Sequence, residues 1–292
     1  MRQFLSMATL NPFRALKFRC ILIGLIGAGF LFGLGLSLLE TLGWLPFKAE
    51  DPVVQPILYL LLSLSLGPIV WWIGHRHRLQ YRALIGTRPK QFSWTAAVVL
   101  TVALLIFSLG AFQLSFYGLS FVAPTLVEET LQQPPTLMTA ETSLPGFYRS
   151  LMLLNVVVVA PVAEEFIFRA LLLHRWGTKW GTPAAVVLSS VLFGVLHTNL
   201  VGLFVFGLVM ALLYLKTRSL WAPIFCHMLN NVLAIALELL AAPGAETTLA
   251  EFRQSSWVGL ILMAASAPWL LRFMLQNWSK TQEALPYFVN AK

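Results

Sequence analysis

Several side chains that can transfer protons or bind an oxyanion occur in stretches that are otherwise apolar. The fourth long apolar stretch contains two adjacent glutamates, Glu164 and Glu165. Later apolar stretches contain His197, and then His227 four residues before Asn231. A carboxylate can take a proton from water, an imidazole can accept or donate one, and a carboxamide can hold a developing oxyanion. Residues of these types are suited to peptide-bond hydrolysis through an activated water.

Helical spacing directs the two adjacent glutamates to different sides of one helix. Glu165 and Arg169 are four residues apart with the acid first, which is the favourable order for an ion pair within a helix. Glu164 points about 100° away around the same helix and has no partner there, so we expect it to act as a general base. If Pro161 breaks the helix, both acids instead fall in a new first turn, where the helix dipole favours the anion. The sequence leaves these two possibilities open.

The sequence does not offer the residue patterns that other hydrolytic mechanisms need. Ser189 and Ser190 precede His197 but are not surrounded by a nucleophile-elbow motif, and the zincin motif His-Glu-x-x-His is absent from the sequence. A paired-aspartate mechanism is excluded because Asp51 is the only aspartate. The two cysteines lie in separate apolar stretches without metal-binding spacing, so we interpret them as small hydrophobic residues.

The composition places these residues in a membrane protein. Of 292 residues, 58% are hydrophobic and 11% are charged, whereas a soluble domain carries about 25% charged residues. The net charge of +8 does not indicate nucleic-acid binding, because the basic residues flank apolar stretches and form no stripe with interleaved aromatics. We therefore expect an all-α, polytopic fold whose partner is the lipid bilayer.

Eight transmembrane helices are predicted, since about 20 apolar residues cross the hydrocarbon core. One stretch, 183–215, is too short for two full spans and is interrupted at its middle, which predicts a tight helical hairpin with a tip inside the membrane profile. Irregular backbone at that depth must be buried in protein or line a wet cavity. The predicted spans are 20–41, 53–74, 94–122, 148–173, two helices within 183–215, 219–241 and 256–276.

The distribution of Lys and Arg predicts the orientation. With both termini in the cytoplasm, only Lys48, Arg149 and Arg253 lie on the outer side, which agrees with the positive-inside rule. The first 17 residues are predicted to lie on the inner surface as a basic amphipathic segment. They are not expected to be a signal peptide, because the apolar run that follows is too long. The expected location is the plasma (inner) membrane of a bacterium.

Depth along the helices brings the polar residues into one layer. Counting about 1.5 Å per residue from the inner helix ends places four of them ~12 to ~21 Å inside the membrane: Glu164, His197, His227 and Asn231. By contrast, Glu128 and Glu129 fall in the predicted outer loop 123–147, where carboxylates are solvated, and we expect no catalytic role for them. His75, His77 and His174 are expected to be solvated at the inner surface.

Three short motifs occur in order on consecutive predicted helices. They are Glu-Glu-x-x-x-Arg at 164–169, Phe-x-x-x-His at 193–197 and His-x-x-x-Asn at 227–231. In this order they resemble the CPBP family, also called the ABI or CAAX-protease and bacteriocin-processing family, which includes the Ras-converting CAAX endopeptidases. The resemblance covers about 147–242. It implies a catalytic core at 147–242. Topology alone predicts an N-terminal membrane region at 1–146 and a last helix with a cytoplasmic tail at 243–292.

The resemblance also implies roles for the polar residues. Glu164 would activate water together with His197, while His227 and Asn231 would stabilise the oxyanion and the Glu165–Arg169 pair would support the site. The implied activity is that of an intramembrane endopeptidase acting on a membrane-associated substrate, which is a CAAX-like or lipidated protein or a leader peptide.

Alternatives remain open at this stage. Glu164, His197 and His227 could supply three zinc ligands, although a metal-free mechanism is favoured because Asn231 is a poor zinc ligand and a good oxyanion donor. A non-catalytic immunity or scaffold protein is a second function attributed to such sequences. A proton-coupled transporter is a third, since buried Glu and His can form a proton relay, but no internal repeat supports it.

Overall fold

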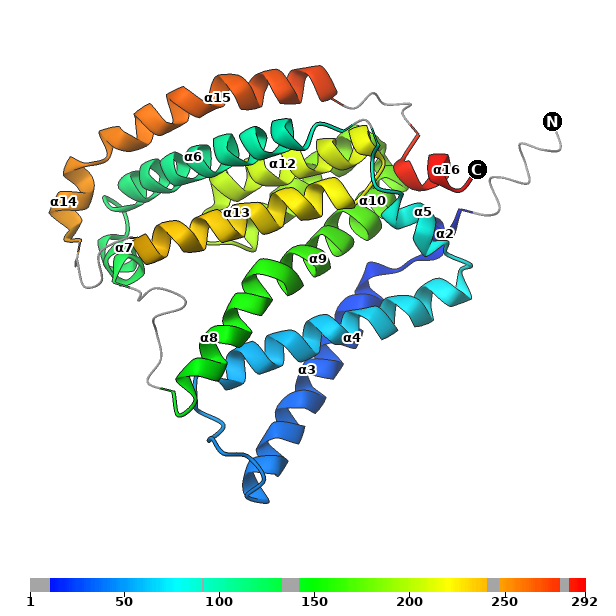
Figure 1. Cartoon of the computed structure of the whole chain (residues 1–292), viewed down its shortest axis with the longest axis horizontal. Helices are drawn as coiled ribbons and strands as arrows, with labels where there is room; N and C mark the ends of the chain where they lie inside the picture. The colour runs from blue at the N-terminus through cyan, green and yellow to red at the C-terminus, as the bar shows by residue number, and fades with distance from the viewer. Residues whose placement is uncertain (1–10, 91, 133–141, 241–246, 279–283) are drawn as a thin grey trace. The chain divides into compact units, whose positions relative to one another are not determined.

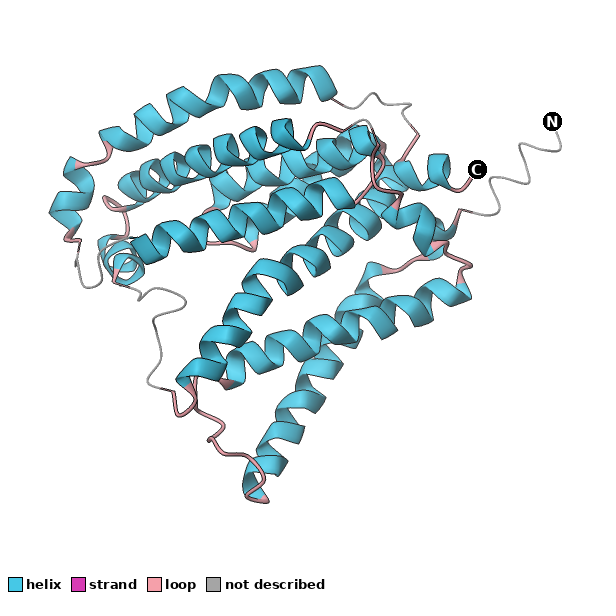
Figure 2. Cartoon of the chain, viewed as in Figure 1, coloured by secondary structure: helices cyan, strands magenta, loops and turns pink. Residues whose placement is uncertain are grey.

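A computed structural model describes residues 11–90, 92–132, 142–240, 247–278 and 284–292. The structure is 80% helical, and within these ranges no residue belongs to a β-strand (Figure 2). The predicted all-α fold is therefore confirmed. The predicted amphipathic segment at the N-terminus falls mostly outside the described residues, of which the short helix α2 (Pro12–Ala15) is the first element.

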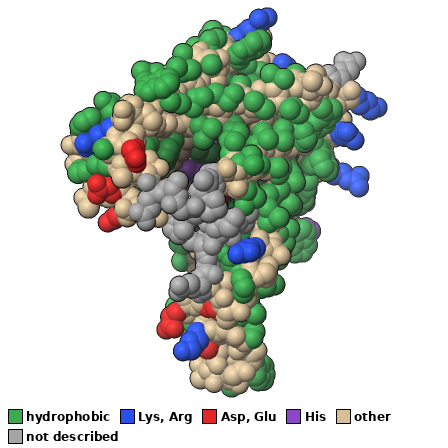
Figure 3. Space-filling model, turned by 60° about the vertical axis from the view of Figure 1, so that its left-hand side comes forward, with side chains coloured by type: hydrophobic (Ala, Val, Ile, Leu, Met, Phe, Trp, Pro, Cys, Tyr) green, Lys and Arg blue, Asp and Glu red, His purple; other side chains and the backbone are tan. Residues whose placement is uncertain are grey.

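The described residues include seven helices that are long and apolar enough to cross a membrane. The second helix of the predicted hairpin is among these seven, whereas the first, α11 (Thr182–Val195), is apolar but only 14 residues long. Hydrophobic side chains cover most of the surface visible in Figure 3, and charged side chains are sparse on it. The seven helices are α3 (Phe18–Thr41), α4 (Val54–Arg76), α6 (Trp94–Leu119), Pro145–Trp180, α12 (Leu200–Thr217), α13 (Trp221–Leu240) and α15 (Trp257–Asn277).

The helix Pro145–Trp180 carries both glutamates and does not break at Pro161. A proline lacks the N–H of a normal helical hydrogen bond, and its ring clashes with the carbonyl four residues earlier. Here a wide π-helical turn precedes it, which loosens the backbone at that point. Both acids therefore lie inside a continuous helix, and the first-turn alternative is wrong. Its parts are α8 (Pro145–Leu154), η1 (Asn155–Val159), α9 (Ala160–Glu165), η2 (Phe166–Leu172) and α10 (Leu173–Trp180).

The chain divides into two compact units. The first comprises residues 1–81 and 136–164. In it α4 packs on α3, η1 and α8 (Figure 1), and the side-chain amide of Asn155 donates a hydrogen bond of 2.8 Å to the Pro56 carbonyl oxygen. That bond satisfies a buried amide and joins two helices whose apolar surfaces give little specificity in lipid.

The second unit comprises residues 82–135 and 165–292. In it α6 packs on α15, α12 and α13, and α11 packs on α12 (Figure 1). A Cβ at Gly110 would lie 2.6 Å from the Gly259 carbonyl oxygen, and one at Gly194 would lie 2.6 Å from the Leu200 carbonyl oxygen. Glycine is thus needed for the close approach of α6 to α15 and of α11 to α12. The predicted boundaries at 146 and 242 remain a prediction. The two units are defined by backbone contacts and do not test those boundaries.

Two local expectations had different outcomes. Part of the segment expected as an outer loop forms the helix α7 (Pro124–Leu131), on which Glu128 and Glu129 are both exposed. The expectation of a solvated His174 is wrong, because this residue is fully buried. Its ring accepts a 3.1 Å hydrogen bond from the Tyr287 backbone N–H of the short helix α16 (Pro286–Asn290). The C-terminal segment therefore covers a histidine that hydropathy assigned to the interface.

Candidate active site

A buried network joins the end of α9 and η2 to α13 within the second unit. Glu165 Oε2 lies 3.0 Å from Arg169 Nε, and Glu165 Oε1 lies 2.9 Å from His227 Nδ1. The exposed fractions are 0% for Glu165, 0% for Arg169 and 4% for His227. A buried carboxylate is tolerated when it is paired and hydrogen-bonded. The predicted ion pair is present, and His227 is a further partner of the same carboxylate.

The contact to Glu165 orients the His227 ring. A carboxylate only accepts hydrogen bonds, so Nδ1 of His227 carries the hydrogen and Nε2 is the nitrogen available for chemistry. Second-sphere carboxylates orient other functional histidines in the same way. In the neutral ring Nε2 is then an acceptor, and it donates a hydrogen bond only when the ring carries both hydrogens.

His197 lies at the tip of the α11–α12 hairpin, directly after α11 ends. Its Nδ1 lies 2.6 Å from the backbone oxygen of Phe193, and a carbonyl oxygen can only accept, so Nδ1 is again the protonated nitrogen. In the neutral ring Nε2 then carries the lone pair that can accept a proton. The residue is half-buried, which suits a base that must meet water.

The hairpin tip is held by Asn199. Its side-chain oxygen caps α12 by accepting from the Gly202 N–H at 3.1 Å. Its side-chain nitrogen donates to the backbone and hydroxyl oxygens of Ser108 on α6, at 2.8 and 2.9 Å. These bonds fix the turn that carries His197 against α6. The sequence predicted the tip but gave no reason to single out Asn199.

Phe193 brings the two imidazoles into one neighbourhood. Its ring centroid lies 4.6 Å from that of His197 and 5.9 Å from that of His227, and the Arg169 guanidinium carbon lies 4.9 Å from it. The cation faces an aromatic ring away from water, where the attraction is strongest. The second unit thus gathers four of the predicted site residues around one phenylalanine: Glu165, Arg169, His197 and His227.

Asn231 lies one helical turn after His227 on α13 and is half-buried. Its side-chain oxygen accepts a 3.3 Å hydrogen bond from the Asn230 side chain. That bond directs the oxygen of Asn231 toward its neighbour and leaves the NH₂ group as the donor end of the amide. An amide NH₂ group is the type of donor that an oxyanion needs.

Glu164 belongs to the first unit, where its contact is with Tyr59 on α4. The two side chains share a hydrogen bond, and Tyr59 also interacts with Ser63 one turn further along. A carboxylate accepts, so the tyrosine hydroxyl is the donor. Tyr59 was missed from the sequence. The available signal was the pair of polar side chains four residues apart within an apolar span.

The two serines that precede His197 in the sequence bond to their own helix. The hydroxyls of Ser189 and Ser190 both donate to the Val186 backbone oxygen, at 3.2 and 2.7 Å, and both residues are buried. Such bonds to the preceding turn satisfy hydroxyls inside a helix. Their geometry agrees with the exclusion of a serine mechanism from the sequence.

Two comparisons with known proteins fall on the segment that carries the three motifs. Residues 146–233 match the family described as type II CAAX prenyl endopeptidase Rce1-like. The "Putative membrane peptidase YdiL" of Bacillus subtilis (strain 168) is 34% identical over 92 residues, which are 30% of this chain and 38% of that relative. No solved structure matches. The relationship of this segment to the CPBP/CAAX protease family is thereby confirmed.

Proposed function

We propose that this chain is an intramembrane endopeptidase of the CAAX-protease type. The observation that carries the proposal is the buried Glu165–His227 contact inside the family-related segment. The rings of His197 and His227 both lie against the Phe193 ring. A carboxylate-oriented imidazole beside a second imidazole supports proton transfer to and from a peptide bond. Helices long enough to span a bilayer support a substrate that is itself associated with the membrane.

The proposed reaction is attack by water on the peptide carbonyl. Glu164, together with Nε2 of His197, takes a proton from the water as its oxygen bonds to the carbonyl carbon. The oxyanion that forms accepts hydrogen bonds from the Asn231 amide and from Nε2–H of His227 in its doubly protonated form. The C–N bond then breaks, and the proton held by the base passes to the leaving nitrogen. Glu165 holds the His227 ring in place through Nδ1–H, and Arg169 pairs with Glu165.

We infer a metal-free mechanism. The reason is the chemistry of Asn231, whose carboxamide is a poor zinc ligand and a good donor to an oxyanion. Metal analysis of purified, active protein tests this. We expect substoichiometric zinc and activity that survives chelation, whereas one zinc per chain, lost together with activity, would contradict the mechanism.

The proposed substrate is a membrane-associated protein or peptide, either CAAX-like and lipidated or a leader peptide. Support comes from the description of the matched family, which names prenylated CAAX substrates. Location in the plasma membrane with both termini in the cytoplasm is part of the same proposal, and it rests on the distribution of Lys and Arg.

The decisive experiment maps peptide cleavage by mass spectrometry with the protein in lipid nanodiscs. A farnesylated CAAX peptide and its unmodified form are offered to the wild type, Glu164→Gln and Glu128→Gln. Glu128 is the matched control, because it also belongs to a Glu-Glu pair but is exposed on α7. We expect cleavage by the wild type and Glu128→Gln and none by Glu164→Gln. Equal cleavage by all three would remove Glu164 from the mechanism.

A further inference from the structure

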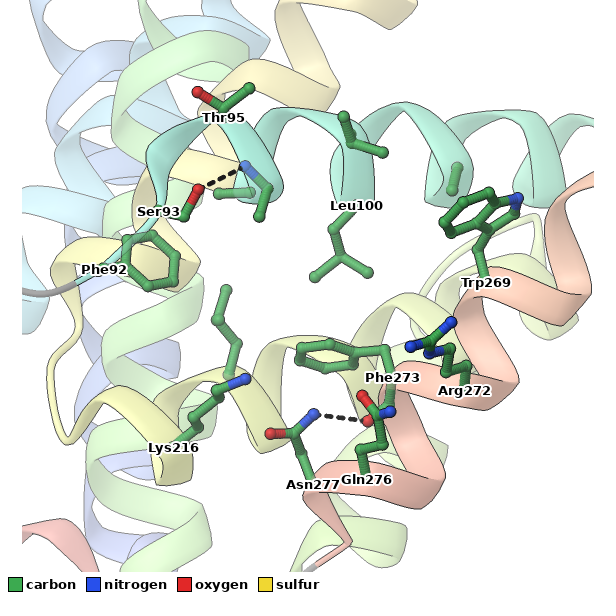
Figure 4. Close-up of a pocket in the computed structure, with 15 residues that line it drawn as sticks. Phe92, Ser93, Thr95, Leu100, Lys216, Trp269, Arg272, Phe273, Gln276 and Asn277 are labelled. Carbon is green, nitrogen blue, oxygen red and sulfur yellow. Dashed lines mark hydrogen bonds between the residues drawn. The ribbon is translucent and has the colours of Figure 1, made fainter.

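A cavity of about 720 Å³ lies within the second unit, away from the candidate active site (Figure 4). Three helices of that unit form it: the first part of α6, the end of α12 and the end of α15. No residue of the proposed catalytic set is among the described residues that line it. A cavity of this size is in the range of small-molecule sites, which span about 300–1,000 Å³.

The rim of the cavity is cationic. Lys216 near the end of α12 and Arg272 near the end of α15 are both exposed, and in Figure 4 their head groups lie on either side of the Phe273 ring. The Lys216 ammonium nitrogen lies 5.6 Å from the centroid of that ring. No Asp or Glu is among the described lining residues, so the two positive charges are not neutralised within the cavity.

The wall beyond the rim is apolar. Val99 and Leu100 on α6 and Leu213 on α12 line it, and they belong to helices that are long enough to span a bilayer. Trp269 on α15 also lines the cavity, and 64% of this residue is exposed. Exposed tryptophans are typical of helix surfaces near a membrane interface. One site thus combines a cationic entrance at the helix ends with an apolar wall that continues along the helices.

We propose that this cavity binds an anionic phospholipid. The phosphate would accept hydrogen bonds from Lys216 and Arg272, and one acyl chain would lie against Val99, Leu100 and Leu213. Basic pockets between transmembrane helices are suited to anionic head groups, since the surface potential and the direct ion pairs act together. The apolar wall favours a lipid over a free phosphate, because inorganic phosphate would contact the rim alone.

Native mass spectrometry of the detergent-purified full chain tests the proposal, with phosphatidylglycerol as the probe and phosphatidylcholine of equal chain length as the neutral comparison. We expect the wild type to bind phosphatidylglycerol in preference. At about 1 kcal/mol for each basic residue, Lys216→Gln and Arg272→Gln should each weaken binding about 5-fold, and the double variant about 30-fold. Leu100→Trp places a larger side chain in the space beside the apolar wall. It should weaken binding while leaving both charges in place.

The matched control removes two other cations that also lie over aromatic rings at helix ends. Arg76 is 4.3 Å from the Trp72 centroid and Lys179 is 4.5 Å from the Trp180 centroid, and neither lines the cavity. The double variant Arg76→Gln/Lys179→Gln changes net charge by the same amount and should retain phosphatidylglycerol. Circular dichroism of each variant shows whether the fold is intact.

Three results would overturn the proposal. Equal loss of lipid in the control variant would mean that binding follows overall charge. Displacement of phosphatidylglycerol by millimolar inorganic phosphate would assign the rim to a free anion. Displacement by a farnesylated peptide, with a raised KM in the rim variants, would assign the cavity to the substrate. Because the readout is bound lipid, a failure of the proposed protease activity leaves this test intact.

Discussion

At the scale of single residues, the carboxylate of Glu165 contacts two partners at once, Arg169 and His227. The first contact neutralises a guanidinium that is 0% exposed, and the second sets the tautomer of an imidazole. Structural and functional tasks are therefore combined in one side chain. This combination makes it possible to separate stability from activity by mutation.

Glu165→Leu should destabilise the protein by about 3–5 kcal/mol, because it leaves the buried Arg169 charge without its counterion. The double variant Glu165→Leu/Arg169→Met replaces the ion pair by apolar groups and should recover most of that stability. Activity should stay about 10- to 100-fold low in the double variant, since His227 still lacks its Nδ1 acceptor. Thermal melting and peptide cleavage measure the two effects. Full activity in the double variant would refute the role assigned to Glu165.

Tyr59 gives a second prediction at this scale. Tyr59→Phe removes the hydrogen bond to the Glu164 carboxylate and should lower kcat about 10-fold with little change in KM, because the bond orients the base and not the substrate. Ser65→Ala is the matched control, since the Ser65 hydroxyl on the same helix donates to the Leu62 backbone oxygen. A change in KM alone would argue against a positioning role.

The sequence predicted the Glu165–Arg169 pair because both residues belong to one helix, where spacing determines contact. It could not predict the contact of Glu165 with His227, which joins residues 62 positions apart. Nor could it predict the Tyr59–Glu164 bond. Such contacts depend on how helices pack, and apolar helices in lipid carry no inside–outside pattern that would reveal their packing. The catalytic roles of Glu164, His197, His227 and Asn231 remain predictions.

At the scale of elements, the α11–α12 hairpin positions His197 through a turn of a few residues. Its two supports are the Asn199 bonds to Ser108 and the close approach of the helices at Gly194. The length of the apolar stretch was enough to predict the hairpin and its tip. The bond to α6 was not predictable, since Ser108 lies 91 residues away.

Asn199→Ala should destabilise the protein by about 1–2 kcal/mol through loss of the helix cap, with a further loss from the Ser108 bonds. Asn199→Asp keeps the acceptor for the Gly202 N–H but loses the donor to Ser108. It should therefore be less destabilising than Asn199→Ala and still reduce cleavage. Melting temperature and kcat are the measurements, with the exposed Thr125→Ala on α7 as a neutral control. Equal kcat in all three variants would show that the tip does not depend on this anchor.

The segment before α8 is tied to the start of α4 by a carboxylate. Asp51 accepts hydrogen bonds from the Ser143 hydroxyl and backbone N–H, at 2.6 and 2.9 Å, from the Thr142 hydroxyl, and from the Val53 N–H at 2.9 Å. These bonds, led by that from Ser143, hold the pKa of Asp51 well below its usual value. The ionised form is thus favoured by the fold.

A depressed pKa stabilises the fold above the unfolded value of about 3.9, and the stabilisation is lost as the pH falls through the lower folded value. Amide hydrogen exchange at Ser143, corrected for the intrinsic effect of pH, should therefore stay slow from pH 7 to about 4 and rise below that. Asp51→Asn should raise it already at pH 7. Exchange that increases between pH 7 and 5 in the wild type would contradict this assignment.

At the scale of the whole molecule, hydropathy was sufficient to identify an all-α membrane protein and most of its spans. It failed for His174. The nearby basic residues suggested a position at the membrane interface, whereas a segment distant in the sequence buries this side chain. α16 supplies that cover, and the Asn290 side chain donates to the Ala83 and Arg218 backbone oxygens at 3.0 and 2.8 Å. The second unit is thus joined by contacts between distant parts of its sequence.

Deletion of residues 285–292 should destabilise the second unit, since it removes the N–H donor to the buried His174 ring and exposes α10. An unsatisfied buried group costs about 1–3 kcal/mol. Removal of residues 291–292 alone leaves these contacts intact and is the control. Urea unfolding in a mild detergent compares the two truncations. Identical midpoints would mean that α16 contributes nothing to stability.

The shortness of α11 has a consequence for the surrounding bilayer. Its 14 residues rise about 21 Å, which is about 9 Å less than a typical hydrocarbon core. Lipids beside a short helix adapt by thinning, at a modest cost for each ångström of mismatch. Head groups and water then come closer to His197 than the mean bilayer thickness would allow. A polar peptide reaching the hairpin tip therefore crosses a shallower apolar barrier beside α11 than elsewhere around the protein.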